Sequence, residues 1–356
     1  MSAPNVKPAA TTAYKHAGPE NIPIVFNLYL PTSAALPSDT LTLPTVVFFH
    51  GGGLAVGDQT WFPPWLYDRV MSLGYASLSA NYQLLPPGTV HDVIQDIQDL
   101  FTYLENTNIA LEDKRSFRAD MNRVAVAGSS SGGHCAYLAA MHCVPKPKAI
   151  FTIYAVGGSF FTPFYLVEKT KPFFMGQNLQ DPARLKQFLH PFEGGSQTKI
   201  SESSVVFDPV TRAPNNIRMA APPLWIQLGV VLDHYTGLHE PSLSAQLRKV
   251  LEENPHATSK DFEKVIPISQ RYTFPELNIS AAWPPTLSLH GDADSAVLVS
   301  ESQHLTKLLK EAGVDAEVMV ASGQEHMFDM DPTSEGQWAK QYDTAKDFFF
   351  KHLGKA

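Results

Sequence analysis

Apolar residues recur along this chain in two patterns, short continuous runs and longer stretches with a helical period. The clearest periodic stretch follows Thr89, where apolar residues lie one or three positions apart and Asp92, Asp96 and Asp99 stand between them. This spacing places the apolar side chains on one face of a helix, and Thr89 with Asp92 is typical of a helix N-terminus. The short runs are rich in β-branched and aromatic residues, which is typical of buried strands.

The two patterns alternate over most of the chain. We expect strands at residues 22–30, 45–49, 75–80, 123–127, 149–155, 286–289 and 316–320, and helices at residues 61–73, 89–104, 131–141, 300–312 and 342–352. Strands that alternate with helices in this way predict an α/β fold, with a mostly parallel central sheet flanked by helices.

The alternation stops between residues 157 and 281, where the sequence is rich in proline and phenylalanine. We interpret this segment as a cap inserted into a core that is formed by residues 1–156 and 282–356, which share one sheet. A single phenylalanine there is more typical of the cap's own core than of a substrate-binding wall. As a group they suggest an apolar pocket. The phenylalanines concerned are Phe160, Phe161, Phe164, Phe173, Phe174 and Phe188.

Composition and charge narrow the class of protein. The 356 residues include 44% apolar and 17% charged residues, which is typical of a globular protein. The net charge of -8 and the absence of a basic cluster exclude a nucleic-acid-binding class. No apolar run approaches the roughly 20 residues of a membrane span, and residues 1–8 lack a secretory signal, so we expect a cytoplasmic protein. The oligomeric state stays open, with a homodimer as one option.

The sequence offers no pattern of metal ligands or disulfides. Cys135 and Cys143 both fall on the helix expected after Ser130, and eight residues of helix span about 12 Å, too far for a disulfide bond. No set of histidine, cysteine and aspartate residues has metal-ligand spacing. We therefore expect two unpaired core cysteines and no metal or other cofactor.

A candidate nucleophile lies where one expected strand meets the next helix. Residues 128–133 read Gly-Ser-Ser-Ser-Gly-Gly directly after an apolar run, which centres Ser130 in a Gly-x-Ser-x-Gly frame. Glycines allow the strained turn that lifts such a serine above the end of a sheet. Ser129 and Ser131 are also hydroxyl residues, but neither occupies the centre of the frame.

A serine hydroxyl needs a base within hydrogen-bond reach and a third group that orients the base. His326 and Asp294 each follow an expected strand, and the carboxyl ends of parallel strands meet at one edge of a sheet. Asp292 is an alternative acid, but Asp294 fits a Gly-x-x-Asp spacing from Gly291 and is favoured. Glu325 beside the base should point elsewhere, as a surface or supporting group.

Backbone donors for an oxyanion are expected after the strand at residues 45–49, where three glycines follow His50. Gly52 and Gly53 can each direct an N–H group into the site because they carry no side chain, and the N–H of Ser131 at a helix start would add a third. We interpret His50 as a brace for this glycine loop. His134 and His290 are interpreted as packing or hydrogen-bonding residues.

These motifs resemble those of the hormone-sensitive-lipase-like branch of the α/β-hydrolase superfamily, over residues 20–353. His50 to Gly53 resembles the oxyanion motif of that family, residues 128–133 its nucleophile elbow, and residues 290–294 and 326–328 its acid and base loops. Residues 81–86 resemble its Tyr-Arg-Leu-Ala-Pro segment, with Gln83 in place of arginine. Ser129 and Ser131 stand where the family usually has aspartate and alanine, and the segment after Gly157 is longer than usual.

The sequence therefore predicts a serine hydrolase that cleaves carboxylic esters of small to medium apolar substrates. Ser130 attacks, His326 transfers the proton, Asp294 orients His326, and Gly52, Gly53 and Ser131 bind the oxyanion. The expected partner is a small-molecule ester. An amidase, a lactonase or an acyltransferase would use the same triad. A ligand-binding receptor on a hydrolase fold is the alternative from a different class of protein.

Overall fold

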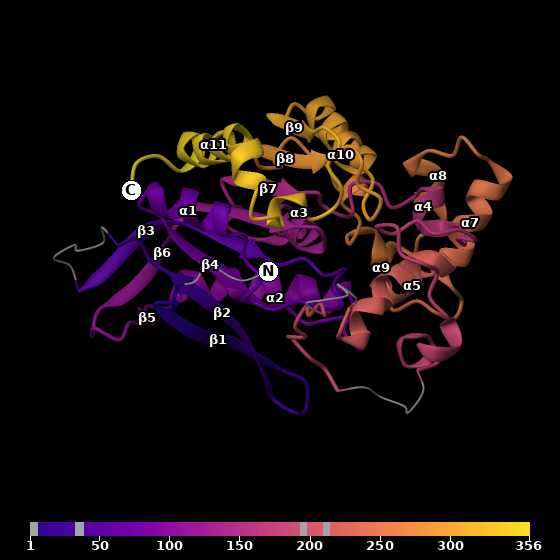
Figure 1. Cartoon of the computed structure of the whole chain (residues 1–356), viewed down its shortest axis with the longest axis horizontal. Helices are drawn as coiled ribbons and strands as arrows, with labels where there is room; N and C mark the ends of the chain where they lie inside the picture. Colours follow the sequence, from indigo (N-terminus) through magenta and orange to yellow (C-terminus); the bar gives the residue numbers. More distant parts are fainter. Residues whose placement is uncertain (1–5, 33–38, 193–197, 209–213) are drawn as a thin grey trace.

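The structure is a computed structural model that describes residues 6–32, 39–192, 198–208 and 214–356. The described residues form a nine-stranded sheet in the order β1-β2-β4-β3-β6-β7-β8-β9, with β5 paired to β6 (Figure 1). The adjacent strands β4-β3-β6-β7-β8-β9 are parallel to one another. The pairs β1–β2, β2–β4 and β5–β6 are antiparallel. The strands are β1 (Ala10–Ala17), β2 (Ile22–Tyr29), β3 (Thr40–Phe49), β4 (Ala76–Ala80), β5 (Ile109–Ala110), β6 (Ser116–Ser129), β7 (Ala149–Ile153), β8 (Thr286–Gly291) and β9 (Ala316–Ala321).

Two apolar clusters cover the two faces of this sheet. Side chains of a strand alternate between faces, so Val47 and Phe49 pack with α2 and α3, whereas Val46 and Phe48 pack with α1 and α11. Burial on both faces explains why the central strands read as continuous apolar runs. The helices that follow the strands of the sheet are α1 (Pro64–Ser72), α2 (Val90–Asn106), α3 (Ser131–His142), α10 (Val299–Glu311) and α11 (Ser334–Leu353).

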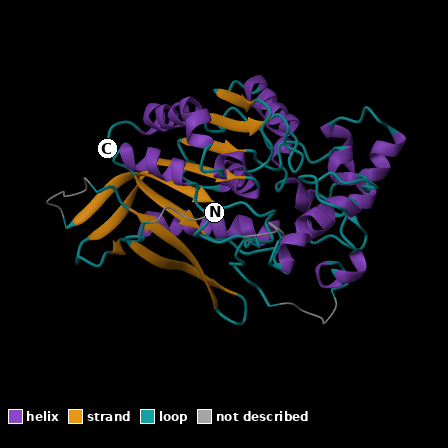
Figure 2. Ribbon diagram, viewed as in Figure 1, coloured by secondary structure: helices purple, strands orange, loops and turns teal. Residues whose placement is uncertain are grey.

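Residues 157–281 lie between β7 and β8, and we call them the insertion. Figure 2 shows their helices gathered beyond one end of the sheet, and the described part of the insertion contributes no strand to it. Residues 193–197 and 209–213, which we expected to belong to a cap, lie outside the described residues. The insertion holds α4 (Pro163–Leu166), α5 (Ala221–Leu228), α6 (Val231–Thr236), α7 (Leu243–Glu253), α8 (Ser259–Val265) and α9 (Ile268–Arg271), with short 3-10 turns η1 (Pro182–Arg184), η2 (Lys186–Phe188), η3 (Ile217–Ala220) and η4 (Pro275–Leu277).

The mostly parallel sheet with flanking helices confirms the predicted fold class. The capping box of Thr89 and Asp92 is also present at the start of α2. The strands β1 and β5 were not predicted, because β1 is a partly exposed edge strand with polar residues and β5 has two residues. Helix α11 begins eight residues earlier than expected, since its first turns carry few apolar side chains to mark them.

Two further expectations concern cysteines and membranes. Cys135 and Cys143 are both unpaired and buried, as expected. None of the helices in the described ranges is long and apolar enough to cross a membrane. Residues 1–5, which include part of the segment that we searched for a signal, lie outside the described residues.

Candidate active site

Ser130 sits in a sharp turn between β6 and α3. Its backbone has φ +54° and ψ -123°, outside the regions that non-glycine residues ordinarily occupy. Hydrogen bonds hold this conformation: the N–H of Ser130 donates to the Ile153 carbonyl at 2.9 Å, and its carbonyl accepts from Gly133 at 3.0 Å and Val156 at 3.1 Å. The end of β7 therefore fixes the turn that presents the Ser130 hydroxyl.

The glycines around Ser130 are required by close backbone packing. A Cβ atom at Gly128 would lie 2.1 Å from the Gly132 carbonyl oxygen, and one at Gly132 would lie 2.0 Å from the Phe49 carbonyl oxygen. Both contacts are with backbone, so neither can be relieved by a side-chain movement. The elbow therefore packs directly on the end of β3, where the second predicted motif begins.

The structure brings the three predicted triad residues together. The Nε2 atom of His326 lies 3.1 Å from the Ser130 hydroxyl oxygen, and its Nδ1 atom lies 2.7 Å from Oδ2 of Asp294. The alternative acid Asp292 is exposed and instead accepts a 2.5 Å hydrogen bond from the N–H of Gly323. Asp294, and not Asp292, is thus the carboxylate that faces the base.

Asp294 is held as a buried anion. Its Oδ1 atom accepts hydrogen bonds from the N–H groups of Ala296 and Val297, at 2.9 and 2.8 Å. Burial raises the pKa of Asp294, but His326 and hydrogen bonds from His290, His326 and Val297 outweigh burial and hold that pKa well below its usual range. The carboxylate therefore stays charged at neutral pH and can accept the Nδ1–H of His326.

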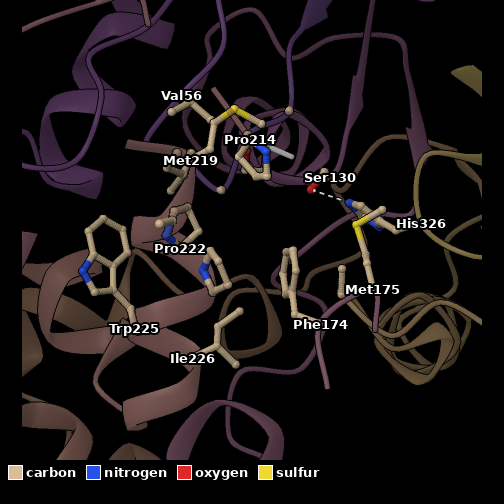
Figure 3. A pocket seen from close by; sticks show the side chains of 18 of the residues that line it. Val56, Ser130, Phe174, Met175, Pro214, Met219, Pro222, Trp225, Ile226 and His326 are labelled. Carbon is tan, nitrogen blue, oxygen red and sulfur yellow. Dashed lines mark hydrogen bonds between the residues drawn. The ribbon is translucent and has the colours of Figure 1, made fainter. Parts of the chain in front are cut away.

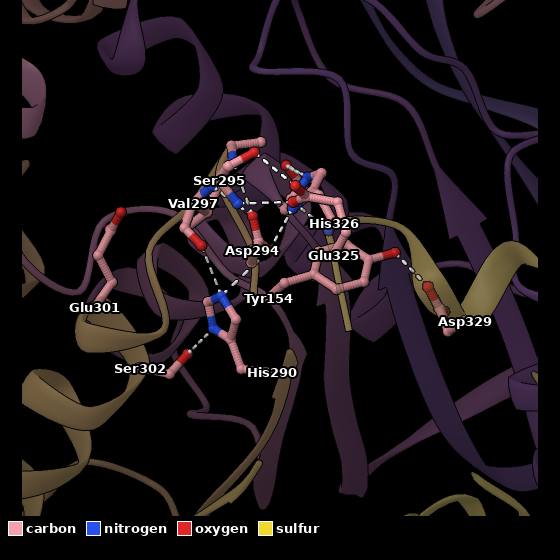
Figure 4. A network of polar contacts seen from close by, with 12 residues as sticks. Tyr154, His290, Asp294, Ser295, Val297, Glu301, Ser302, Glu325, His326 and Asp329 are labelled. Atoms are coloured by element: carbon pink, nitrogen blue, oxygen red, sulfur yellow. Dashed lines mark hydrogen bonds and ion pairs between the residues drawn. The ribbon is translucent and has the colours of Figure 1, made fainter. Parts of the chain in front are cut away.

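His290 is the second imidazole beside this carboxylate (Figure 4). Its Nε2 atom lies 2.9 Å from the Val297 carbonyl oxygen and 3.4 Å from Oδ2 of Asp294, while Nδ1 lies 2.8 Å from the Ser302 hydroxyl. Because only an N–H can serve a carbonyl, Nε2 carries the proton and Nδ1 accepts from Ser302. The predicted hydrogen-bonding role of His290 is thus observed, and it reaches the acid itself.

The glycine loop after β3 lies beside Ser130. The His50 ring stacks on Tyr82 with a centroid separation of 4.5 Å, and its Nδ1 atom lies 2.8 Å from the Gly51 carbonyl oxygen. Burial lowers the pKa of His50 to about 4, so the ring is neutral near pH 7 and braces the loop as expected. Gly52 has φ +112°, and a Cβ atom there would lie 2.1 Å from the Val56 carbonyl oxygen, which excludes any side chain.

Comparison with known proteins supports the observed fold. Residues 26–147 match the family model BD-FAE, and residues 235–356 match the prolyl oligopeptidase family model. An α/β-hydrolase superfamily protein from Enterococcus faecalis superposes with a TM-score of 0.58 and 15% identity, over 97% of this chain and 100% of that one. The chain therefore has the α/β-hydrolase fold. This confirms the resemblance on which the sequence-based prediction relied.

Other similarities of the chain are to esterases and to parts of larger proteins. Esterase 2 of Thermogutta terrifontis superposes with a TM-score of 0.55 and 15% identity, over 98% of this chain and 94% of that one. The probable carboxylesterase M8 of a Phoma species is 28% identical over 40% of this chain and 46% of its own length. The non-reducing polyketide synthase pkbA of Emericella nidulans is 25% identical over 91% of this chain and 13% of its own length. The chain therefore spans less than half the length of either relative.

Sequence reasoning missed a further set of contacts that supports the His326 ring. The Tyr154 ring packs on the His326 ring with centroids 4.5 Å apart, and its hydroxyl donates to Oδ1 of Asp329 at 2.5 Å. The Nε1–H of Trp65 donates to the other oxygen of Asp329 at 3.0 Å. Burial raises the pKa of Asp329, although Tyr154, Trp65 and His326 lower it. The sequence signal that could have found these residues is their position, because Tyr154 directly follows β7 and Asp329 lies three residues after His326.

Glu325 joins the acid loop to the base loop. Its carboxylate accepts hydrogen bonds from the N–H of Ser295 at 2.7 Å, the hydroxyl of Ser295 at 2.6 Å and the N–H of His326 at 2.8 Å. All three donors belong to the two loops and none is a nitrogen of the His326 ring. Glu325 is therefore a supporting group, one of the two roles that the sequence suggested.

A cavity of about 850 Å³ lies beside Ser130 (Figure 3). Gly52, Gly53, Ser131 and His326 line it from the sheet side. The insertion supplies most of the apolar wall. Among the described lining residues, the aspartate and arginine side chains are those of Asp181 and Arg184, which are both exposed, and no lysine or glutamate is included. The described residues contain no group of three or more histidine, cysteine, aspartate or glutamate side chains that could hold a metal ion. The apolar wall includes Phe174, Met175, Met219, Pro222, Trp225 and Ile226.

Proposed function

We propose that this α/β-hydrolase cleaves carboxylic esters through an acyl-enzyme on Ser130. The observation that carries the proposal is the continuous path from the Ser130 hydroxyl through both nitrogens of His326 to Asp294, at 3.1 and 2.7 Å. An ionised Asp294 accepts from Nδ1–H, so the lone pair of Nε2 faces the serine hydroxyl. His326 then takes the Ser130 proton during attack on the ester carbonyl carbon and returns it to the leaving alcohol.

Gly52, Gly53 and Ser131 are proposed to bind the oxyanion that forms in this attack. All three line the cavity beside Ser130. The N–H of Ser131 opens helix α3 and therefore has no acceptor within that helix. Donors placed in this way stabilise the tetrahedral intermediate, and each is typically worth about 10²- to 10³-fold in rate. Water that enters the site then attacks the acyl-enzyme, with His326 as general base.

The wall of the cavity supports small to medium apolar esters as substrates. Its volume of about 850 Å³ lies within the roughly 300–1,000 Å³ range of small-molecule sites. Charged side chains from the insertion are confined to the exposed Asp181 and Arg184 among the described lining residues. An uncharged substrate is therefore favoured. In this proposal the insertion acts as a cap, and residues 1–156 and 282–356 form the catalytic core.

A second candidate is transfer of a polyketide-derived acyl group to an alcohol by the same serine. The match to non-reducing polyketide synthases favours it, because pkbA and Preu3 match over 91% and 94% of this chain. Acyl transfer would follow the same first half of the reaction, with an alcohol in place of water. Product analysis with an added alcohol separates the two, since hydrolysis yields the free acid and transfer yields a new ester.

A fluorophosphonate probe and a panel of acyl esters test the proposal. The probe is expected to label the wild-type protein at Ser130 and not the Ser130→Ala variant. Hydrolysis of the panel is expected with the wild-type protein and is expected to be lost in the Ser130→Ala variant, because the acyl-enzyme cannot form without the Ser130 hydroxyl. A protein that binds esters without turnover and without labelling would be a receptor and would refute the proposal.

A further inference from the structure

The insertion is hydrogen-bonded to the proposed oxyanion loop, which we define as residues 51–57. Arg218 belongs to η3 of the insertion, and its Nε–H donates to the carbonyl oxygen of Ala55 within the loop at 2.6 Å. Its Nη2 atom donates to the carbonyl oxygens of Leu85, at 2.7 Å, and Pro86. One guanidinium thus joins the oxyanion loop to the segment after β4.

Hydrogen bonds within the loop connect Ala55 to Gly52, so the Arg218 contact also restrains the glycines. The N–H groups of Ala55 and Val56 both donate to the Gly52 carbonyl oxygen at 3.1 Å, which closes a tight turn from Gly52 to Val56. The N–H of Leu85 donates to the Leu54 carbonyl oxygen at 2.8 Å, so the two segments held by Arg218 are also bonded to each other. Fixing the Ala55 carbonyl therefore limits rotation of the peptide groups on either side of Gly53.

Two more contacts link the insertion to the same loop. Gly57 and Ser203 exchange hydrogen bonds of 2.6 and 3.0 Å. Pro222, at the start of α5, packs so closely on Gly53 that a Cβ atom on Gly53 would lie 2.5 Å from the proline ring. The insertion therefore touches the oxyanion loop at its beginning, its middle and its end.

Arg218 is itself held in one orientation. Its guanidinium lies 5.8 Å from the centre of the Phe188 ring, and its N–H donates to the side chain of Asn216 at 3.0 Å. Asn216 also donates to Ser203 at 2.8 Å, next to the contact with Gly57. Burial lowers the pKa of Arg218 to about 10, so the group remains a cation at neutral pH. The planar fork of arginine suits several carbonyl acceptors at once, whereas lysine offers a single nitrogen.

We propose that Arg218 is a positioning residue for oxyanion stabilisation. Its guanidinium fixes the oxyanion loop so that the N–H groups of Gly52 and Gly53 face the carbonyl oxygen of the substrate. The inference rests on the proposed ester hydrolysis and extends it, because the insertion then contributes to the reaction step as well as to the cavity wall. Arg218 touches neither the substrate carbonyl nor the triad in this proposal.

The test compares Arg218→Met with Arg248→Met. Arg248 is a matched control, since it is also a partly buried arginine of the insertion that donates to two backbone carbonyls, of Leu166 at 2.5 Å and Gly229 at 2.8 Å, outside the oxyanion loop. Each variant is assayed for kcat and KM with a short ester, and for affinity towards a trifluoromethyl ketone. Such ketones form a serine adduct that carries an oxyanion, so their affinity reports on the oxyanion site.

We expect Arg218→Met to lower kcat about 10- to 100-fold, less than the roughly 10²- to 10³-fold loss of a whole donor. The ketone affinity should fall by a similar factor, and KM should change by less than threefold. Arg248→Met should leave kcat, KM and ketone affinity near the wild-type values. Arg218→Lys should recover part of the loss. Equal kcat in the two methionine variants, or a lower kcat with unchanged ketone affinity, overturns the proposal.

Amide hydrogen exchange separates this inference from the proposed function. Peptides that cover residues 51–57 should exchange faster in Arg218→Met than in Arg248→Met, at temperatures where both are folded. This readout needs no turnover, so a wild-type protein that cleaves no ester would refute the proposed function while exchange still decides the role of Arg218. Unchanged exchange in the loop would refute that role, even in an active esterase.

Discussion

The strand-end loops of the sheet and the insertion line one cavity but contribute differently to it. The loops carry Ser130, Asp294 and His326, each fixed by backbone hydrogen bonds at the end of a strand. The insertion contributes apolar wall residues such as Phe174 and Trp225. Within the described lining, its charged side chains are those of Asp181 and Arg184, and both are exposed. If the proposed function holds, the reacting groups lie at the sheet edge, whereas the insertion shapes the substrate-binding wall and, through Arg218, supports the oxyanion loop.

Removing the nucleophile gives the largest expected effect. Ser130→Ala should lower kcat by about 10⁴- to 10⁶-fold, because the other triad members have no nucleophile to activate. Binding of a non-hydrolysable ester analogue should change less than threefold, since the walls are intact. Steady-state kinetics and calorimetry measure the two quantities. Retention of more than a tenth of the wild-type kcat would mean that the reactive group lies outside the sheet-edge loops.

The acid is tested with a matched pair of variants. Asp294→Asn should lower kcat by about 10⁴-fold, because an amide no longer fixes His326 in the tautomer that accepts the serine proton. Asp292→Asn provides the control, since Asp292 is exposed and bonds to the Gly323 backbone. Its kcat should stay within threefold of the wild-type value. A larger loss in Asp292→Asn than in Asp294→Asn would reverse the assignment of the acid.

The same contrast explains how much could be predicted from the sequence. In the core, strand periodicity and short local motifs placed Ser130, Asp294 and His326 at strand ends, and the parallel sheet brings those ends together. The support given by Tyr154 and Asp329 was missed, because it joins β7 to residues 175 positions later and no short motif marks it. Arg218 was missed for a similar reason, since its backbone acceptors have no side-chain signature.

Glu301 joins the core to the insertion. This buried residue of α10 accepts hydrogen bonds from the N–H groups of Gly157 and Gly158, at 2.7 and 3.2 Å, and from the hydroxyl of Tyr165. Burial raises the pKa of Glu301 to about 8, against the lowering effect of these hydrogen bonds. A carboxyl group therefore holds the first residues of the insertion against the core.

The pH dependence of Glu301→Gln follows from that raised pKa. Between the ordinary carboxyl pKa and about 8, folded Glu301 keeps its proton while the unfolded chain loses it, so stability falls as pH rises, by at most about 1.4 kcal/mol per pH unit. Glutamine does not titrate. The free energy of unfolding of the variant should thus rise relative to the wild type from pH 5 to pH 8, as measured by urea denaturation. A constant difference across that range would show that Glu301 is ionised in the folded protein.

The smallest expected effect concerns the wall. Phe174 and Phe173 are adjacent and partly buried, but Phe174 lines the cavity whereas Phe173 packs on Phe164 and Lys169. Phe174→Ala should lower kcat/KM for a bulky apolar ester about three- to tenfold, because burying a partly exposed aromatic ring contributes less than the roughly 1.5–3 kcal/mol of a fully buried one. For an acetyl ester the change should be below twofold, and Phe173→Ala should leave the ratio of the two substrates unchanged. Equal losses on both esters would mean that Phe174 acts on the reaction step, as proposed for Arg218. The wall of the insertion and its Arg218 contact with the oxyanion loop would then no longer have separate roles.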